Sequence, residues 1–550
     1  MTAPFKHAAQ FPEGRASTTS FNEASARTRV ALLLDAGSFV EFIGPEQREV
    51  SPHLKVFDLP EQFNDGIVVG RGRLDGAPVF VAAQEGRFMG GAFGEVHGAK
   101  LIGLLRAARE MVSIPVLILF DTGGVRLQEA NAGELAIAEI MRAMMEARMA
   151  GVKVVGLIGG RSGCYGGGGL IAGCCSALAV SEPGRIAVSG PEVIETNRGV
   201  EEFDSRDRAL VWRTMGGKNR RLLGAADVFT DDTIQGFRDA ALELLGLVGA
   251  FDLDKLKAEQ CVSRTGCEAL APARMPSTSG RPKASPTPSR FPICPPTSSS
   301  PSPTRSGGPA VTLDDILTCL FPDGHDVKND NGVVAGSATL RSGAEALVIG
   351  VADKTALGVD EAIRLSGHVL DSFAQGRGPI LVLVDSDSQR MSKRDELLGL
   401  NEFLAHLAKS LIYADMHHQP TIGILYGHSA AGALLATGLA TRVLVGVPGA
   451  TPAVMDLPSM AKVTKLSMEA LQEKAKSTPV FAPGLSNLVQ MGAVHVTWND
   501  AVSLAEQLDA LLANMPDAHD RRDALGRERG GRLKAAEIAE RVRDLALHSH

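Results

Sequence analysis

The chain has 550 residues, which is too long for one hydrophobic core and favours several domains of roughly 100 to 200 residues each. Hydrophobic residues make up 44% of it and charged residues 22%, and its 60 glycines indicate many tight turns, as in a folded α/β protein. The formal net charge of -7 argues against nucleic-acid binding, since neutralising phosphates needs an excess of Lys and Arg.

Cysteine usage and the N-terminus bear on the compartment. The seven cysteines are odd in number and lack the paired spacing of a zinc site, which favours a reducing environment and predicts no metal centre. The first residues lack the apolar core of a signal peptide, and the apolar runs are too short to cross a bilayer. We therefore expect a cytoplasmic protein with no membrane partner.

A Pro/Ser-rich segment divides the chain. Residues 271–310 hold eleven prolines and nine serines, a composition that buries too little apolar surface to fold. We predict a disordered linker over residues 263–310, between an N-terminal domain over 1–262 and a C-terminal domain over 311–550.

The same order of elements is predicted on both sides of this linker. A β-rich stretch leads into a helix, and then an apolar strand ends at an aspartate, Asp121 or Asp385. A long amphipathic helix and a further strand follow, and that strand runs into a small-residue helix start. The step from Asp121 to Gly167 is 46 residues and the step from Asp385 to Gly432 is 47 residues, which we interpret as an internal duplication. The predicted strands are 78–83, 114–121, 152–160, 346–351, 379–385 and 421–427, and the predicted helices are 95–110, 135–151, 360–373 and 397–414.

Alternating strands and helices at these spacings imply right-handed βαβ crossovers, stacked into a layered α/β spiral rather than one barrel. A further pair of motifs, PEVI at Pro191 and PAVM at Pro452, falls in the same order in the two halves. We take this pair as additional support for the duplication.

Four motifs of the N-terminal half carry a resemblance to a known family. They are GRFMGGAFGEVHGAKL, FDTGGVRLQEA, GLIGGRSGCYGGGGLIAG and GPEVIE, and they resemble the carboxyltransferase branch of the crotonase superfamily. With EEFDSRDR and MGGKNRR, this half is similar to the β subunit of malonate decarboxylase. The C-terminal half, with ELLGLNEFLAHLAK and YGHSAAGALLATG, looks like the γ subunit. The resemblance implies two crotonase-like ββα-spiral domains, of the ClpP/crotonase and carboxyltransferase type, in one fused chain.

The resemblance also implies a reaction and its partners. It implies decarboxylation of a malonyl thioester to the acetyl thioester and carbon dioxide, as the β/γ component of a biotin-independent malonate decarboxylase complex. The substrate would arrive on the phosphopantetheine-type prosthetic group of an acyl carrier protein, with no covalently bound cofactor. The implied partners are the acyl carrier protein subunit, an acyl-carrier-protein transferase subunit and further copies of this chain in a homo-oligomer.

Decarboxylation leaves an enolate whose charge develops on the thioester oxygen, so the catalyst needs hydrogen-bond donors at that point. A strand that turns into a helix presents free amides there, and small residues let the backbone approach. We predict Gly166 and Gly167 in one half, and Ala431 and Gly432 in the other, as oxyanion-hole residues.

A second loop follows the first aspartate of each half. Gly123, Gly124 and Arg126 resemble the loop that lines the acyl pocket of carboxyltransferases, while the alternative for Arg126 is a structural ion pair with Glu129. The matching loop of the second half, DSDSQRM, has no glycine pair, which predicts that one half holds the enolate while the other shapes the pocket. The residues alone leave open which half does which.

Polar side chains flank both turns. Tyr165, His428 and Ser429 are predicted substrate-binding residues, and with Cys164 and Tyr426 they are also candidates for the proton donor, although water would suffice. A basic cluster, Lys218, Arg220 and Arg221, is either a solvated face or a docking patch for a carrier protein or a phosphate group.

Three alternatives remain open from the residues. A biotin-dependent carboxyltransferase would use the same turns to move the carboxyl group onto a biotin protein. A serine hydrolase would use Ser429 in YGHSAAG with Asp456 and His495, although the final glycine of a G-x-S-x-G elbow is missing. A non-catalytic scaffold for an acyl carrier protein is the third alternative.

Overall fold

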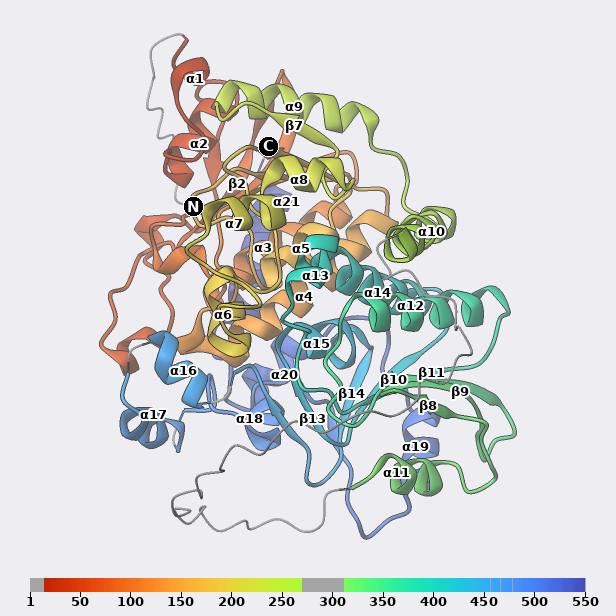
Figure 1. Ribbon diagram of the computed structural model, residues 1–550. Coiled ribbons are helices and arrows are strands. Elements are labelled where there is room, and N and C mark those ends of the chain that lie inside the picture. Colours follow the sequence, from red (N-terminus) through yellow and green to blue (C-terminus); the bar gives the residue numbers. More distant parts are fainter. Residues whose placement is uncertain (1–13, 270–310, 456, 465, 477, 550) are drawn as a thin grey trace, which may run out of the picture.

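The computed structural model describes residues 14–269 and 311–549, except 456, 465 and 477. It contains two seven-stranded sheets, one in each half of the chain (Figure 1). The first sheet comprises, in spatial order, β1 (Val40–Glu41), β2 (Ile67–Leu74), β3 (Ala77–Gln84), β4 (Val116–Phe120), β5 (Val154–Ile158), β6 (Ala177–Ser181) and β7 (Val228–Thr230). The second comprises β8 (Lys328–Asp330), β9 (Val333–Thr339), β10 (Glu345–Val351), β11 (Ile380–Val384), β12 (Thr421–Leu425), β14 (Val443–Gly446) and β16 (Val496–Thr497).

Helices cover both sheets. In the first half they are α1 (Arg15–Thr18), α2 (Ala26–Leu33), α3 (Glu95–Glu110), α4 (Ala130–Met149), α5 (Gly167–Gly173), α6 (Pro191–Arg198), α7 (Arg208–Met215), α8 (Gly217–Leu222), α9 (Ile234–Leu247) and α10 (Leu253–Ala269). In the second half they are α11 (Leu313–Leu320), α12 (Val359–Ala374), α13 (Lys393–Leu398), α14 (Leu400–Met416), α15 (Ala431–Ala436), α16 (Leu457–Thr464), α17 (Met468–Ala475), α18 (Leu485–Gln490), α19 (Leu504–Ala513), α20 (Arg522–Glu528) and α21 (Ala535–His548). Among the described residues, no helix is both long and apolar enough to cross a membrane.

The two sheets repeat one topology. Strands β3 to β7 run parallel, as do β10, β11, β12, β14 and β16, and each parallel set is flanked by an antiparallel strand, β2 or β9. Short parallel bridges between the loops above the strands repeat as well, Phe93 with Val125 and Leu357 with Gln389. Each unit therefore consists of a long strand, a short bridging segment and a helix, which confirms the predicted ββα spiral and its duplication.

One part of the predicted repeat is wrong. Pro191 begins helix α6, whereas Pro452 lies in the short strand β15 (Thr451–Ala453), which pairs with β13 (His428–Ala430). The counterpart of that pairing in the first half is the bridge between Cys164 and Ile186, which precedes Pro191. PEVI and PAVM are therefore not equivalent. They have similar sequences and follow similar elements, but they occupy different structural positions in the two halves.

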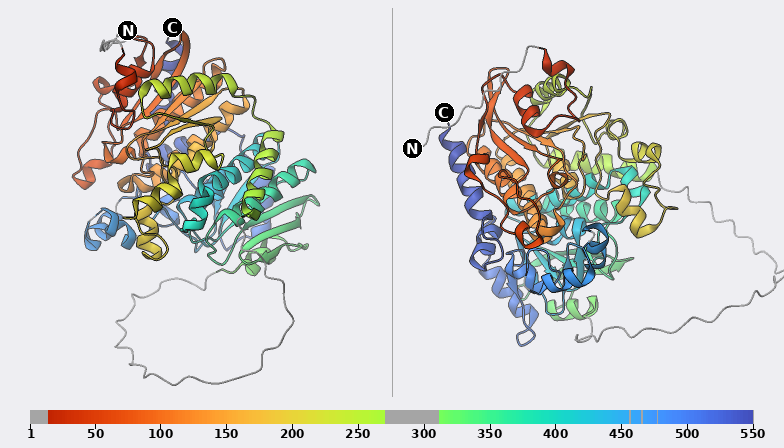
Figure 2. Two further views of the ribbon diagram at one scale, coloured as in Figure 1. Left: turned by 45° about the horizontal axis from the view of Figure 1, so that its top comes forward. Right: turned by 90° about the vertical axis from the view of Figure 1, so that its left-hand side faces the viewer.

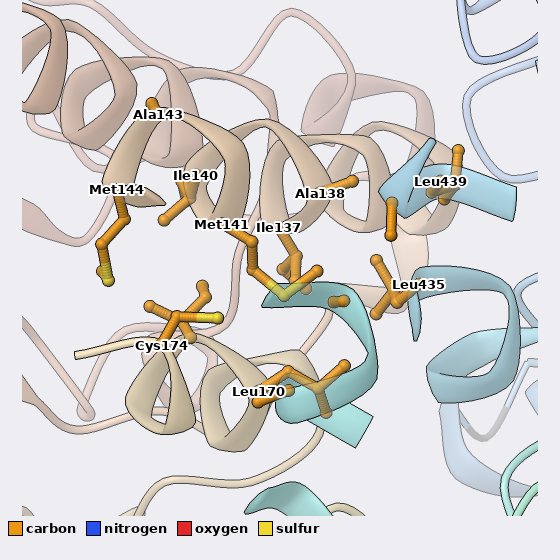
Figure 3. Packing of buried hydrophobic residues seen from close by; sticks show 14 of the residues in the cluster. Ile137, Ala138, Ile140, Met141, Ala143, Met144, Leu170, Cys174, Leu435 and Leu439 are labelled. Atoms are coloured by element: carbon orange, nitrogen blue, oxygen red, sulfur yellow. The ribbon is translucent and has the colours of Figure 1, made fainter. Parts of the chain in front are cut away.

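The core strands are buried on both faces, as their continuous apolar runs indicate. All five residues of β4 and all five of β11 are buried. Between the sheets, α4 packs against α3, α5, α14 and α15. Figure 3 shows Ile137 and Met141 of α4 directed toward Leu170 of α5 and Leu435 of α15, so one apolar core joins the two halves.

The end of the chain returns to the first half. Helix α21 runs alongside α3, where Figure 2 shows the C-terminal blue helix against the orange helices. The Glu95 carboxylate accepts the Lys534 and Ala535 N–H groups at the start of α21, at 2.6 and 3.0 Å. Arg532 forms a buried two-pronged ion pair with Glu139 of α4, at 2.8 and 2.5 Å.

Helix α10 continues to Ala269, past the predicted domain boundary at residue 262. The remainder of the predicted linker, residues 270–310, lies outside the described residues. The three-part division of the chain therefore stays a prediction.

We predict that the halves stay together when the chain is cut within residues 270–310, because the shared core and the α21–α3 contact do not depend on an intact connection. A protease site placed there and cleaved should give two fragments that elute as one peak in gel filtration at micromolar concentration. Two separate peaks would contradict a shared core.

Glu139→Ala should lower the free energy of unfolding by about 3–5 kcal/mol, because it leaves the Arg532 guanidinium buried without its counterion. Urea unfolding of the full chain measures this. The control is Glu537→Ala, which removes an exposed partner of Arg541 and should cost less than about 1 kcal/mol. Equal effects of the two variants would show that the Glu139–Arg532 pair does not hold α21 in place.

Candidate functional site

Two strand-to-helix turns face each other across the boundary between the halves. Gly166 has φ 58° and ψ -133°, a conformation open to glycine, and it precedes α5, which begins at Gly167. The equivalent residue of the second half, Ala431, has φ 47° at the start of α15, where a residue with a Cβ is strained. The duplicated backbone bend is therefore kept even where the residue is unfavourable for it.

A cavity of about 620 Å³ lies between these turns. It is lined by residues of both halves, so neither half encloses it alone. Of the ten predicted site residues, six line the cavity, and Gly124, Arg126, His428 and Ser429 do not. The six are Gly123, Tyr165, Gly166, Gly167, Ala431 and Gly432.

The four predicted oxyanion-hole amides differ in their hydrogen bonds. The Gly166 N–H donates to the Val188 carbonyl, and the Gly432 N–H donates to the Gln389 side-chain oxygen, both at 3.0 Å. Among the described residues, the Gly167 N–H has no acceptor within hydrogen-bonding distance, whereas Ala431 directly follows the parallel pairing of β13 with β15, which ends at Ala430 and Ala453. The first half thus offers a free amide at the start of a helix that lines the cavity, while the Gln389 side chain occupies the equivalent Gly432 amide of the second half.

Val188 and Ser189 join the two turns. Their N–H groups donate to the carboxylate of Glu396 from the second half, at 3.2 and 2.5 Å, and burial raises the pKa of Glu396 to about 7 although these donors act in the opposite direction. Gln389 links the same segment to the other turn, because its side-chain NH2 donates to Ser189 Oγ at 3.3 Å. The cavity wall is therefore built by reciprocal contacts across the boundary.

Arg126 takes the structural role that the sequence left as an alternative. Its side chain is buried and pairs with Glu129 at 2.6 Å and Asp65 at 2.8 Å, away from the cavity. The duplication repeats this arrangement, because Arg390 pairs with Asp395 at 3.6 Å beneath the equivalent loop. Gly124 is a spacer, since a Cβ there would lie 3.2 Å from the Tyr165 carbonyl oxygen.

The candidate proton donors are placed unequally. The Tyr165 hydroxyl is buried without a hydrogen-bond partner in a residue that lines the cavity, and burial raises the pKa of Tyr165 to about 12. Cys164 and Tyr426 are buried outside the cavity lining, and burial raises the pKa of both groups. His428 Nδ1 donates to the Thr451 carbonyl oxygen at 2.5 Å, and His428 does not line the cavity.

The hydrolase arrangement is not assembled around Ser429. Its Oγ is buried and lies 2.9 Å from Ser386 Oγ, and no histidine among the described residues lies within hydrogen-bonding distance of it. His495 instead uses Nδ1 to accept the Leu444 N–H, and Asp456 lies outside the described residues. A nucleophilic serine needs a base within reach, and this one has none.

The basic cluster is not one surface patch. Arg220 is fully buried and donates to the Ile186 and Glu396 carbonyl oxygens at 3.0 and 2.7 Å, so it ties the halves together. Lys218 is exposed and pairs with Glu182, and Arg221 is exposed. The alternation of buried and exposed residues along one short helix separates side chains that are adjacent in sequence.

Two polar residues of the cavity wall, Gln389 and Glu134, were not predicted from the sequence. Gln389 sits in the loop that lacks glycines and engages the Gly432 amide. Glu134 of α4 is 1% exposed and lines the cavity, and neither carboxyl oxygen has a hydrogen-bond partner. Burial raises the pKa of Glu134 well above its usual value. A sequence signal was present, because Glu134 shares one helical face with Ile137 and Met141 in an otherwise apolar stretch.

In the part of the chain that the structure describes, no group of three or more His, Cys, Asp or Glu side chains is placed to hold a metal ion. The cavity wall itself presents a free backbone amide, the unpartnered Glu134 carboxyl and Tyr165 hydroxyl, and the charged side chains of Arg185, Glu192 and Arg208.

The duplicated fold and the paired turns define a carboxyltransferase-type protein, and comparison with known sequences agrees. Residues 19–225 match the carboxyl transferase domain family, and residues 352–546 match the family described as malonate decarboxylase gamma subunit. The malonyl-S-ACP:biotin-protein carboxyltransferase MADC of Malonomonas rubra is 44% identical over 240 residues, which cover 41% of this chain and 75% of that protein. The propionyl-CoA carboxylase beta chain of Saccharopolyspora erythraea is 32% identical over 176 residues, 32% of this chain and 31% of that one. A solved structure, the malonate decarboxylase hetero-tetramer of a Pseudomonas in complex with malonate, is 42% identical with a TM-score of 0.44, covering 47% of this chain and 94% of that chain.

The chain belongs to the carboxyltransferase family of malonate decarboxylases, with a β-like and a γ-like half fused in one polypeptide. It is an enzyme of the carboxyltransferase class built from two crotonase-type domains.

We predict that a fluorophosphonate probe leaves Ser429 unlabelled, because the side chain is buried and lacks a base. Intact-mass measurement after incubation should show the unmodified chain, while a serine protease in the same reaction is labelled fully. Stoichiometric labelling that disappears in Ser429→Ala would restore the hydrolase interpretation.

Proposed function

We propose that this chain decarboxylates a malonyl thioester to the acetyl thioester and carbon dioxide, without transferring the carboxyl group to biotin. The observation that carries the proposal is the free Gly167 N–H, at the start of a buried helix and on the wall of a cavity that both halves enclose. A donor that is already oriented and has no other acceptor stabilises charge that develops on a thioester oxygen at little reorganisation cost.

The two turns take different parts in this proposal. The Gly167 N–H holds the enolate oxygen, while the turn at Ala431 and Gly432 lines the same cavity from the other half and shapes the place of the carboxylate that departs as carbon dioxide. Gly166 and Gly432 act as positioning residues, because their own amides are occupied by Val188 and Gln389. Gly123 and Tyr165 complete the wall on the acyl side.

The substrate carrier is the second part of the proposal. The Malonomonas relative is named for a malonyl-S-ACP substrate, which supports a thioester carrier, and we propose the phosphopantetheine-type group of an acyl carrier protein. The associated partners would be the carrier protein, its transferase subunit and further copies of this chain. The exposed Arg208 and the partly exposed Arg185 line the cavity and provide positive charge for a phosphate-bearing arm.

The same relative supports a second candidate. Its name specifies transfer to a biotin protein. Such an enzyme would use the same oxyanion hole for the enolate, and biotin would bind in the part of the cavity near Ala431 and accept the carboxyl group there. The two functions differ in the fate of the carboxyl group, so one experiment separates them.

The test follows ¹⁴C from a labelled malonyl group on acyl carrier protein, with the purified chain and no biotin present. We expect acid-volatile label to be released at the same rate with and without avidin. Release that requires a biotin protein would establish the carboxyltransferase route instead, and no turnover under either condition would overturn both candidates.

The role of Gly167 can be tested in a background that makes room for a side chain. A Cβ at Gly167 would lie 2.2 Å from Ile137 Cδ1, so a simple Gly167→Pro change would disturb packing as well as remove the amide. The pair Ile137→Ala/Gly167→Pro and Ile137→Ala/Gly167→Ala differs in the N–H group while both have space.

We predict that the Pro variant loses on the order of a hundredfold to a thousandfold in turnover relative to the Ala variant. Single-turnover decarboxylation measures the chemical step, and circular dichroism confirms that both variants fold. A difference within threefold would remove the Gly167 N–H from the oxyanion hole.

A further inference from the structure

One residue of the cavity wall, Glu134, is an acidic side chain buried in an environment that disfavours the ionised carboxylate. Glu134 is 1% exposed, and both of its carboxyl oxygens are buried without a hydrogen-bond partner in the described part of the chain. An ionised carboxylate with no partner in such a place is strongly disfavoured, so the group is a neutral carboxylic acid with one unshared proton.

The surroundings explain why the proton is not removed by a neighbour. The other acidic and basic side chains that lie near Glu134 along α4 are committed elsewhere, Glu139 to Arg532 and Arg142 to Asp415. The titratable groups on the cavity wall are Tyr165, Arg185, Glu192 and Arg208, and none of them is within hydrogen-bonding distance of Glu134. Burial alone therefore raises the pKa of Glu134.

The position of Glu134 relates it to the proposed oxyanion hole. Glu134 and Ile137 are three residues apart and share one face of α4, and Ile137 is the side chain in direct contact with Gly167. The acid and the free Gly167 amide thus line the same cavity from adjoining elements.

We propose that Glu134 is the general acid that protonates the α-carbon of the enolate, a role that rests on the decarboxylase function proposed above. The bond between the α-carbon and the carboxylate breaks, its electron pair forms the enolate, and carbon dioxide leaves. The enolate carbon then takes the Glu134 proton, so a C–H bond forms, the O–H bond breaks and the acetyl thioester results. The Glu134 carboxylate recovers its proton from water before the next turnover.

Glu134 suits this role better than Tyr165, the other unpartnered acid on the wall. A general acid works best with a pKa near the working pH. Burial moves the pKa of a carboxyl upward toward that range, whereas it moves the pKa of Tyr165 further away, to about 12.

The experiment uses a reaction that needs no decarboxylation. By reversal of the last step, the Glu134 carboxylate removes a proton from the acetyl thioester, so the methyl hydrogens of acetyl-S-acyl carrier protein exchange with D2O. Mass spectrometry of the acetyl group measures this exchange. We expect exchange with the unaltered chain, faster as pH rises because the carboxylate form is the base, and at least a hundredfold slower exchange with Glu134→Gln.

Decarboxylation gives the matching readout with the opposite pH dependence. Turnover by the unaltered chain should fall as pH rises through the pKa of Glu134, because the protonated form is the acid. In Glu134→Gln the decrease of turnover with rising pH should be absent, and turnover should be at least a hundredfold lower. Glu134→Asp should retain part of the decarboxylation and part of the proton exchange. The matched control is Glu402→Gln, which alters a carboxyl outside the cavity lining whose pKa burial also raises, to about 7, and should leave exchange unchanged.

The outcomes separate the two proposals. An unaltered chain that releases no carbon dioxide from malonyl-S-acyl carrier protein overturns the proposed function. An active parent whose Glu134→Gln variant keeps exchange and turnover within threefold, or whose pH limb persists, overturns the role of Glu134. If Tyr165→Phe loses the exchange while Glu134→Gln keeps it, the role of Glu134 is also overturned, and Tyr165 is the proton donor instead.

Discussion

The segment Val188–Ser189 is the contact on which the site depends. Its two N–H groups are held by the Glu396 carboxylate of the opposite half, and its Val188 carbonyl receives the Gly166 N–H. Gly166 is thereby kept in the bend that leaves the next amide, at Gly167, without an acceptor. The Gly167 amide, the proposed oxyanion donor of one half, is thus positioned by a carboxylate of the other half.

The polar groups that join the halves differ from those that line the cavity. Buried ion pairs such as Glu139–Arg532 and Arg142–Asp415–Arg442 lock the halves together. Some groups on the cavity wall are instead unpaired, namely the Gly167 amide, the Tyr165 hydroxyl and the Glu134 carboxyl. Unsatisfied polar groups cost stability, so those on the cavity wall mark a place where a ligand could satisfy them.

The duplication also accounts for the division of labour between the halves. Both keep the strand-to-helix bend, but in the second half the loop without glycines places Gln389 on the Gly432 amide. The equivalent arginines both form ion pairs below their loops, Arg126 fully buried and Arg390 partly exposed. The scaffold is therefore symmetric, while the cavity wall is not.

Much of this molecule was determined by its sequence alone. The strands before Asp121 and Asp385, the helices after them and the two small-residue turns all follow from local apolar periodicity and glycine chemistry, which act over a few residues. The tertiary structure decided which of those residues meet. Burial of Arg126 and Arg220, the occupation of the Gly166 and Gly432 amides, and the isolation of the Glu134 proton all arise from contacts between segments far apart in the chain. Such contacts have no local signature, because desolvation and hydrogen-bond pairing depend on what packs against a residue rather than on its neighbours in sequence.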